Sequence, residues 1–104
     1  MIKLIPMQTI VDRYHIYYNG ESVGVIELSV GEDYVEIKYI KIHKEQRRKK
    51  LATKVIKLLK EENKDKEIFG DSLPKAIPFW DSIGVEFYDP FDNDDIILTP
   101  FKLI

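Results

Sequence analysis

Residues 39–59, YIKIHKEQRRKKLATKVIKLL, contain the change of hydrophobic period that decides the fold. Before this change, apolar and polar residues alternate, as expected for a half-buried strand. From Glu45 onward the period is helical, and the apolar residues form one stripe of a helix, namely Leu51, Val55, Leu58 and Leu59. The segment therefore predicts a strand, a short connection and a helix whose start is crowded with cations.

The strand that enters this segment, predicted over residues 34–43, changes its apolar parity near its end. Val35, Ile37 and Tyr39 share one parity, whereas Ile40 and Ile42 take the other. Because side chains alternate between the two faces of a strand, this switch predicts a bulge or a change of buried face near residues 39–40. A strand buried on both faces at its end would give the same pattern.

Toward the N-terminus, three further strands are predicted, over residues 2–7, 14–18 and 23–30. Asn19-Gly20 separates two of them and is a strong hairpin signal, because both residues tolerate the positive φ of a type I′ turn. A second turn is expected at residues 31–33. These strands form an antiparallel meander with the strand of residues 34–43.

Downstream of the first helix, a short strand is predicted over residues 67–70. Pro74 opens a second helix that ends at Gly84, since proline fits the first helical turn. A final β segment covers residues 95–104 and is interrupted by Pro100, which suggests an edge strand or a bulge. The predicted fold is α+β, with one mixed, mostly antiparallel sheet and at least two helices.

The composition limits the class of protein. With 104 residues, 12.2 kDa and 44% hydrophobic residues, the chain is expected to form one globular domain. No apolar run approaches the ~20 residues that cross a bilayer, and the N-terminal segment lacks the pattern of a signal peptide. The chain contains no cysteine and two histidines, which excludes disulfides and thiol chemistry and disfavours a histidine-rich metal centre. A cytoplasmic domain without membrane contact is expected.

The charge is unevenly distributed along the chain. Residues 41–66 hold 11 of the 16 lysines and arginines but only four of the 18 acids. A helix N-terminus presents unpaired N–H groups, so the cations at residues 47–50 predict a phosphate-binding site. A solvated, lysine-rich helix face would explain the same charges.

Two segments at this point resemble the GNAT acyltransferase family. Residues 47–52, RRKKLA, resemble the family's motif A, Q/R-x-x-G-x-G/A, and residues 76–84, AIPFWDSIG, are similar to its A-x-x-F-[YW]-x-x-x-G segment. The resemblance covers about residues 13–88. It implies one GNAT-like domain over residues 1–104 that uses acetyl-CoA as cosubstrate and acetylates a primary amine.

The resemblance also implies a set of site residues. The pantetheine arm of acetyl-CoA is expected to lie along Ile40, Lys41 and Ile42, and its pyrophosphate on the next segment, formed by Arg47, Arg48, Lys49, Lys50, Leu51 and Ala52. Glu36 matches a glutamate that some members use as general base. An exposed strand carboxylate paired with Lys38 is the alternative role for Glu36.

Three departures from the family pattern affect this interpretation. Lys50 stands at the position of the motif's first glycine. Trp80 stands at the position of a tyrosine that protonates the leaving thiolate in the family. Because an indole N–H is not a useful acid, Ser72, Tyr88 or water would supply that proton. The chain also lacks room for the family's usual first two helices. The acceptor pocket would then be open, completed in a homodimer, or not functional.

Two alternative functions follow from these departures and from the charge pattern. The first is a catalytically inactive GNAT-fold module for binding or regulation. The second is nucleic-acid binding through the lysine-rich helix, which would be non-specific because no aromatic or asparagine side chains are interleaved with the cations.

Other polar residues carry weaker signals. His15 and His43 are expected on a sheet face and at a strand end. The acidic run, formed by Asp89, Asp92, Asp94 and Asp95, lacks the glycine and final glutamate of a calcium loop, and no metal site is predicted.

Overall fold

The computed structural model describes residues 1–7 and 12–104, with Arg48 described for its backbone alone. Twelve elements follow one another along the chain: β1 (Ile2–Pro6), β2 (Arg13–Tyr18), β3 (Glu21–Val30), β4 (Tyr34–Ile42), the 3₁₀ turn η1 (Lys44–Lys49), α1 (Leu51–Glu62), β5 (Glu67–Ser72), the 3₁₀ turn η2 (Pro74–Ala76), α2 (Ile77–Ile83), β6 (Glu86–Phe87), β7 (Phe91–Asn93) and β8 (Ile96–Lys102). The predicted α+β fold and order of the main elements are confirmed.

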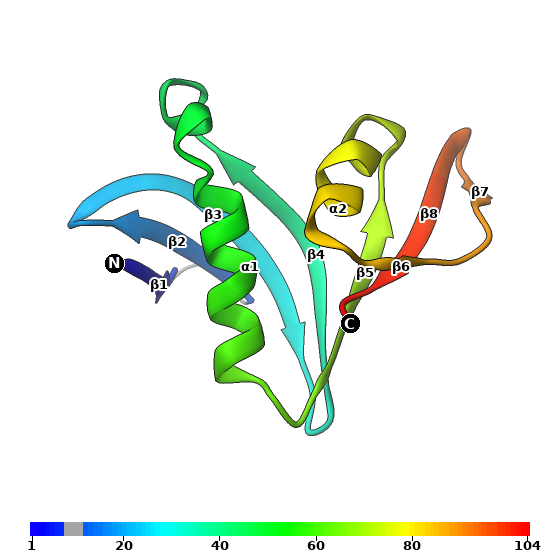
Figure 1. Cartoon of the computed structure of the whole chain (residues 1–104), viewed down its shortest axis with the longest axis horizontal. Coiled ribbons are helices and arrows are strands. Elements are labelled where there is room, and N and C mark those ends of the chain that lie inside the picture. The colour runs from blue at the N-terminus through cyan, green and yellow to red at the C-terminus, as the bar shows by residue number, and fades with distance from the viewer. Residues whose placement is uncertain (8–11) are drawn as a thin grey trace.

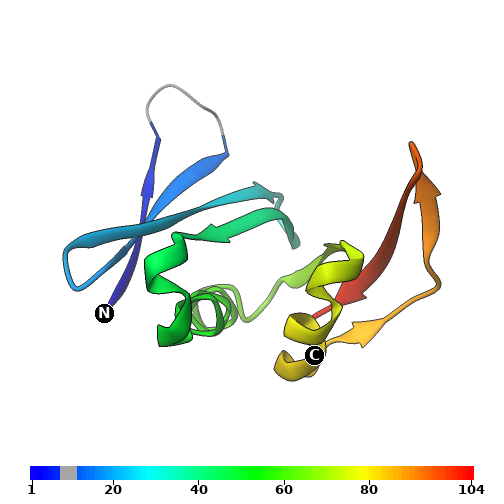
Figure 2. The same ribbon diagram turned by 90° about the horizontal axis from the view of Figure 1, so that it is seen from above.

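The strands form one mixed sheet in the order β1-β2-β3-β4-β5-β8-β6, with β7 paired to β8 beside this path. All pairs are antiparallel except β4 with β5, which are joined by the crossover helix α1. Figure 1 shows β4 and β5 close together at one end and diverging toward the other. Figures 1 and 2 place α1 and α2 on the same side of the sheet.

The core lies between the sheet and these two helices. Helix α1 buries Leu51, Val55, Ile56 and Leu59, whereas Leu58 is only half buried. The stripe predicted from the sequence therefore included Leu58 in place of Ile56. Burying each such side chain stabilises the fold by about 1.5–3 kcal/mol, so these four side chains hold the crossover helix against the sheet.

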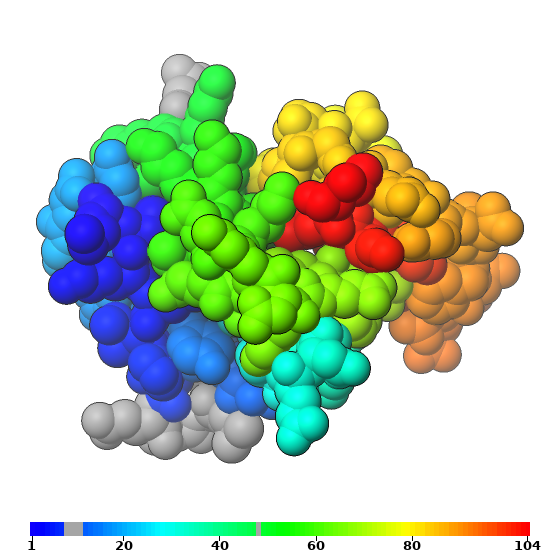
Figure 3. All heavy atoms as spheres, turned by 60° about the horizontal axis from the view of Figure 1, so that its bottom comes forward, coloured from blue at the N-terminus to red at the C-terminus, as the bar shows by residue number. Residues whose placement is uncertain are grey.

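Two hairpins have the turn geometry that their sequences require. Asn19 and Gly20 have φ values of 52° and 84°, as expected for the type I′ turn between β2 and β3. Asp94 and Asp95 also have positive φ values, 49° and 68°, between β7 and β8. Two acids of the run at residues 89–95 therefore form a tight turn. The space-filling view shows this C-terminal part of the chain projecting at the side opposite the N-terminal strands (Figure 3).

The predicted bulge is present in β4, one residue earlier than expected. Ile37 pairs with Leu28 of β3, and Tyr39 pairs with the preceding residue, Glu27, so that Lys38 has no partner in the register. Ile37 is buried, and so is Ile42 beyond the bulge. The extra residue reverses the parity of the strand, which explains the phase change in the sequence.

The first helix starts later than the sequence predicted. The chain forms the 3₁₀ turn η1 from Lys44 and enters α1 only at Leu51. Lys50 separates the two with left-handed backbone angles, φ 55° and ψ 34°. The cations at residues 47–49 therefore precede the helix and do not occupy its first turn. Pro74 likewise opens the 3₁₀ turn η2, and α2 begins at Ile77.

Candidate functional site

The site begins where β4 and β5 separate. Their parallel pairing ends at Ile37 and Gly70, although β4 continues to Ile42 and β5 to Ser72. A Cβ on Gly70 would lie 2.7 Å from the Ile37 carbonyl oxygen and 2.8 Å from the Phe101 ring. Glycine therefore permits the close approach of the strands at their last shared position, and beyond it the gap widens (Figure 1).

Backbone groups of β4 face this gap. The His43 N–H donates to the Val23 carbonyl of β3, with an N···O distance of 2.7 Å. Since successive residues of a strand direct their backbone groups to opposite sides, those of Ile42 and Ile40 point away from β3. The Ile42 carbonyl accordingly accepts a 3.1 Å hydrogen bond from Arg47 Nε. Beyond Ile37, this side of β4 therefore has no strand partner among the described residues.

The N-terminus of α1 adds free amides to the same gap. The first helical hydrogen bond runs from the Lys54 N–H to the Lys50 carbonyl, at 3.2 Å, so the amides of Leu51, Ala52 and Thr53 have no acceptor within the helix. Within the part of the chain that the structure describes, no side chain caps this end. The helix dipole and the three amides together favour an anion here.

These features line one cleft of about 750 Å³. Its walls come from β4, the start of α1, and the segment from Leu73 to α2 across the gap. The lining residues are Tyr39, Ile40, Lys41, Ile42, Arg47, Lys50, Leu51, Ala52, Thr53, Leu73, Lys75, Ala76, Phe79 and Trp80. Four of them are cations and none is a carboxylate, while most of the others are apolar. The cleft is therefore suited to a ligand with anionic groups at one part and an apolar arm at another.

The charge of the cleft is not neutralised by nearby acids. Throughout the described part of the chain, the single ion pair is Lys102 with Glu67, with an N···O distance of 4.0 Å. Lys41, Arg47, Lys50 and Lys75 thus contribute an uncompensated positive potential, which a concave surface concentrates.

Most of the predicted acetyl-CoA residues meet in this cleft. Seven of the nine line it, namely Ile40, Lys41, Ile42, Arg47, Lys50, Leu51 and Ala52. Lys49 is exposed and not among the lining residues, and the side chain of Arg48 lies outside what the structure describes. Sequence reasoning missed Lys75, which reaches the cleft from η2 across the gap, because nothing in its local pattern distinguishes it from other surface lysines.

The three predicted catalytic residues are not brought together. Glu36 is half buried in β4 and lines a neighbouring hollow of about 330 Å³, and it forms no ion pair with Lys38. Ser72 is only 1% exposed, and its hydroxyl donates to the Leu73 carbonyl at 2.9 Å. Tyr88 is 46% exposed and does not line the cleft. Of the three, only Glu36 lines one of these hollows.

Trp80 has a packing role as well as a place in the cleft wall. It is 5% exposed and stacks on Phe101, with ring centroids 4.1 Å apart and planes inclined by 25°. Phe79 meets it edge-on at 4.9 Å. Trp80 is thus a core residue, and the aromatic cluster fixes α2 against β8.

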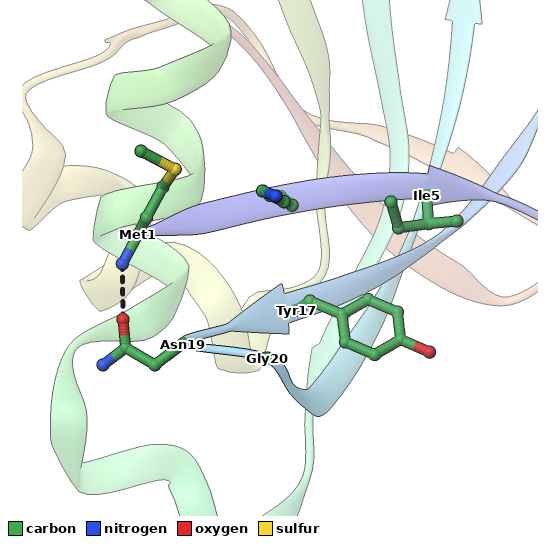
Figure 4. A pocket seen from close by; sticks show the side chains of 6 residues that line it. Met1, Ile5, Tyr17, Asn19 and Gly20 are labelled. Carbon is green, nitrogen blue, oxygen red and sulfur yellow. Dashed lines mark hydrogen bonds between the residues drawn. The ribbon is translucent and has the colours of Figure 1, made fainter.

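A separate hollow of about 510 Å³ lies on β1 and β2 and shares no lining residue with the cleft. It is lined by Lys3, Ile5 and Tyr17 and by the turn at residues 19–20, where the Met1 amine donates to Asn19 Oδ1 at 2.6 Å (Figure 4). Its lining contains the Lys3 side chain and the Met1 amine but no helix end, so this hollow lacks the combination of helix amides and cations that the cleft has.

Among residues 1–7 and 12–104, no group of three acidic or histidine side chains could hold a metal ion. No described helix has the length and hydropathy needed to span a membrane.

Comparison with known proteins supports the same family. None of the curated proteins matches the chain. Among solved structures, a GNAT family acetyltransferase from Elizabethkingia anophelis with acetyl-CoA bound is 12% identical, with a TM-score of 0.71, over 99% of this chain and 96% of that one. An acetyltransferase from Thermus thermophilus is 13% identical, with a TM-score of 0.73, over 92% and 68% of the two chains.

A third similar structure is the ribosomal-protein-S18-alanine N-acetyltransferase from Escherichia coli. It is 14% identical, with a TM-score of 0.71, and the match covers 88% of this chain. The chain spans 66% of the length of that enzyme. The TM-scores of the three matches show a shared fold. The family model of the acetyltransferase (GNAT) domain matches residues 5–104, and the chain therefore belongs to the GNAT acetyltransferase family.

Proposed function

We propose that this protein is an N-acetyltransferase that takes an acetyl group from acetyl-CoA and transfers it to a primary amine. The observation that carries the proposal is the composition of the cleft: four cations, three free helix amides and a wall of apolar side chains, with no carboxylate. Acetyl-CoA combines phosphates with a long, weakly polar arm, so the two kinds of wall match its two parts.

The residues present fit this cosubstrate in a definite order. The amides of Leu51, Ala52 and Thr53 would hold the diphosphate, with Arg47 and Lys50 adding charge beside them. Lys41 and Lys75 line the same cleft and would contribute further positive potential. The Ile42 N–H and the backbone groups of Ile40, which point away from β3, would pair with amide groups of the pantetheine arm. This arrangement directs the thioester toward the bulge of β4.

Transfer requires an amine without its proton and a route for the proton to the leaving thiolate. Glu36 lines the hollow next to the bulge and is our candidate for the group that binds the acceptor amine and accepts its proton. Trp80 carries no useful acidic proton, and the Ser72 hydroxyl is bonded to a backbone carbonyl. Water is therefore the proposed proton source for the thiolate.

Binding is tested first, because the chain has a single tryptophan and it lines the cleft. Acetyl-CoA should change the fluorescence of Trp80 in a saturable way, and calorimetry should give the same dissociation constant. Arg47→Glu should weaken binding at least tenfold, since it reverses a charge in the cleft wall. Lys64→Glu, an equal charge change on an exposed residue outside the cleft, should not. Equal loss in both variants would contradict the assignment of the cleft.

Turnover is tested separately, by thiol release from acetyl-CoA with a panel of primary amines. A second candidate function is a module that binds acetyl-CoA without catalysis, and the bonded hydroxyl of Ser72 together with Trp80 at the proton-donor position favours it. Saturable binding with no amine-dependent thiol release would support that candidate. Release with any amine above the rate without amine would support the transferase.

A further inference from the structure

Two small hollows continue the cleft through the gap between β4 and β5. One, of about 150 Å³, shares Tyr39, Ile40, Leu73, Ala76 and Trp80 with the cleft. The other is the hollow of Glu36, which adds Leu98 of β8 to its lining. The two hollows share Ile37, Lys38, Asp71 and Leu73. The cleft therefore adjoins a passage that emerges beside Glu36.

Lys38 lies in the middle of this passage. It is the unpaired residue of the β4 bulge, it is exposed, and it lines both small hollows. The β4–β5 pairing ends one residue earlier, at Ile37, so no strand covers it on that side. Glu36 and Asp71 line the same hollow, yet within the described residues neither forms an ion pair with Lys38. The only amine side chain of the passage is thus not held by a salt bridge.

The position of Lys38 follows the expected path of the thioester. A cosubstrate with its phosphates at the amides of residues 51–53 and its arm along Ile42 and Ile40 runs toward the start of β4. Residues of a strand are about 3.3 Å apart, so the next side chains on this path are those of the bulge. The bulge turns Lys38 out of the regular register and into the two hollows.

We propose that Lys38 is itself an acetyl acceptor, modified by acetyl-CoA bound in the cleft of the same chain. This inference rests on the proposed function. The Lys38 ammonium loses one proton, and its Nζ attacks the thioester carbonyl carbon. The new C–N bond forms as the C–S bond breaks, and the collapsing intermediate releases its second proton. One proton stays with the coenzyme A thiol and one passes to solvent, with no oxidant or reductant required.

Acetylation would change the charge of the acceptor hollow. Among its six lining residues, Lys38 is the only cation and Glu36 and Asp71 are the anions. Loss of the Lys38 charge leaves the two carboxylates uncompensated, which favours a cationic amine from outside. Self-acetylation would therefore prepare the hollow for its external acceptor.

The experiment incubates the full chain with isotope-labelled acetyl-CoA and measures the acetylation of each lysine by mass spectrometry over time. Lys38 should be modified at least about tenfold faster than Lys57 and Lys60, two exposed lysines of α1 that serve as internal controls for direct chemical acetylation. Equal rates at the three positions would overturn the inference. The rate at Lys38 should not change on dilution of the protein, and a rate proportional to protein concentration would overturn transfer within one chain.

Variants separate this inference from the proposed function. Lys38→Arg keeps the charge and removes the acceptor, so labelled acetyl incorporation should fall to the level of the control lysines. Arg47→Glu should slow the acetylation of Lys38 in proportion to its loss of affinity for acetyl-CoA. If acetyl-CoA binds to the unmodified protein but Lys38 reacts no faster than the control lysines, the self-acetylation is refuted and the proposed function stands. If acetyl-CoA does not bind, both fall.

Discussion

Replacing Lys50 tests the backbone geometry that positions the helix amides. Lys50 has φ 55° and ψ 34° between η1 and α1. In this left-handed region Cβ crowds the following carbonyl oxygen, whereas glycine has no Cβ and adopts it freely. The resemblance to motif A places the motif's first glycine at this position, and these backbone angles favour a glycine here. We expect Lys50→Gly to be more stable than Lys50→Ala.

The size of the difference follows from two opposing effects. The left-handed conformation costs a residue with a Cβ about 1–2 kcal/mol. The glycine variant avoids this cost, but its unfolded chain has more conformational entropy to lose on folding, which lowers its stability by about 0.4–1 kcal/mol relative to alanine. The difference between the two central values gives glycine a net advantage over alanine of about 0.8 kcal/mol. Both variants lose the lysine charge and stem, so their comparison isolates the effect of Cβ.

Urea unfolding, followed by Trp80 fluorescence, measures this difference. With a slope of roughly 1–3 kcal/mol per molar urea, the midpoint of Lys50→Gly should lie a few tenths of a molar above that of Lys50→Ala, with unchanged slope. A midpoint equal to or below that of the alanine variant would show that residue 50 is not held in the left-handed region. Acetyl-CoA should also bind the glycine variant more tightly than the alanine variant, because no Cβ then borders the amides of the cleft.

Three further predictions concern the core, the strand pair and the acceptor hollow. Ile56→Ala should lower the free energy of unfolding by about 2–5 kcal/mol. Leu58→Ala should lower it by clearly less, because Ile56 is buried and Leu58 only half buried. Equal losses in urea unfolding would contradict the packing of α1. Gly24→Ala should cost about 1–3 kcal/mol, since its Cβ would overlap the Lys41 carbonyl oxygen on β4; an unchanged melting temperature would show that the strands do not approach as closely as described. If amine-dependent turnover is observed, Glu36→Gln should lower kcat by about 10²–10⁴-fold. Glu32→Gln, a control in the turn before β4, should leave kcat unchanged. A kcat of wild-type size in Glu36→Gln would exclude Glu36 as the base.

The sequence by itself determined the order of the main elements and the family. Alternation and helical spacing reflect contacts that each segment makes along its own length, so they can be read locally. The Asn19-Gly20 turn and the bulge near Tyr39 were predicted for the same reason, since a turn needs positive φ and a bulge shifts the parity of its own strand. Of the six residues of the motif-like segment 47–52 that were predicted to bind acetyl-CoA, four line one cleft together, namely Arg47, Lys50, Leu51 and Ala52.

Only the tertiary structure decided where α1 begins and which side chains surround the acceptor passage. Cations at residues 47–49 read as the first turn of a helix, but the chain forms a 3₁₀ turn there and enters α1 through Lys50. The short strands β6 and β7 are two and three residues long and are held by pairing with β8, so they leave no periodic signal. Lys38 and Asp71 line one hollow although 33 positions separate them. That meeting depends on where the pairing of two distant strands stops, and a long-range contact of this kind is set by the packing of the whole sheet and not by any local pattern.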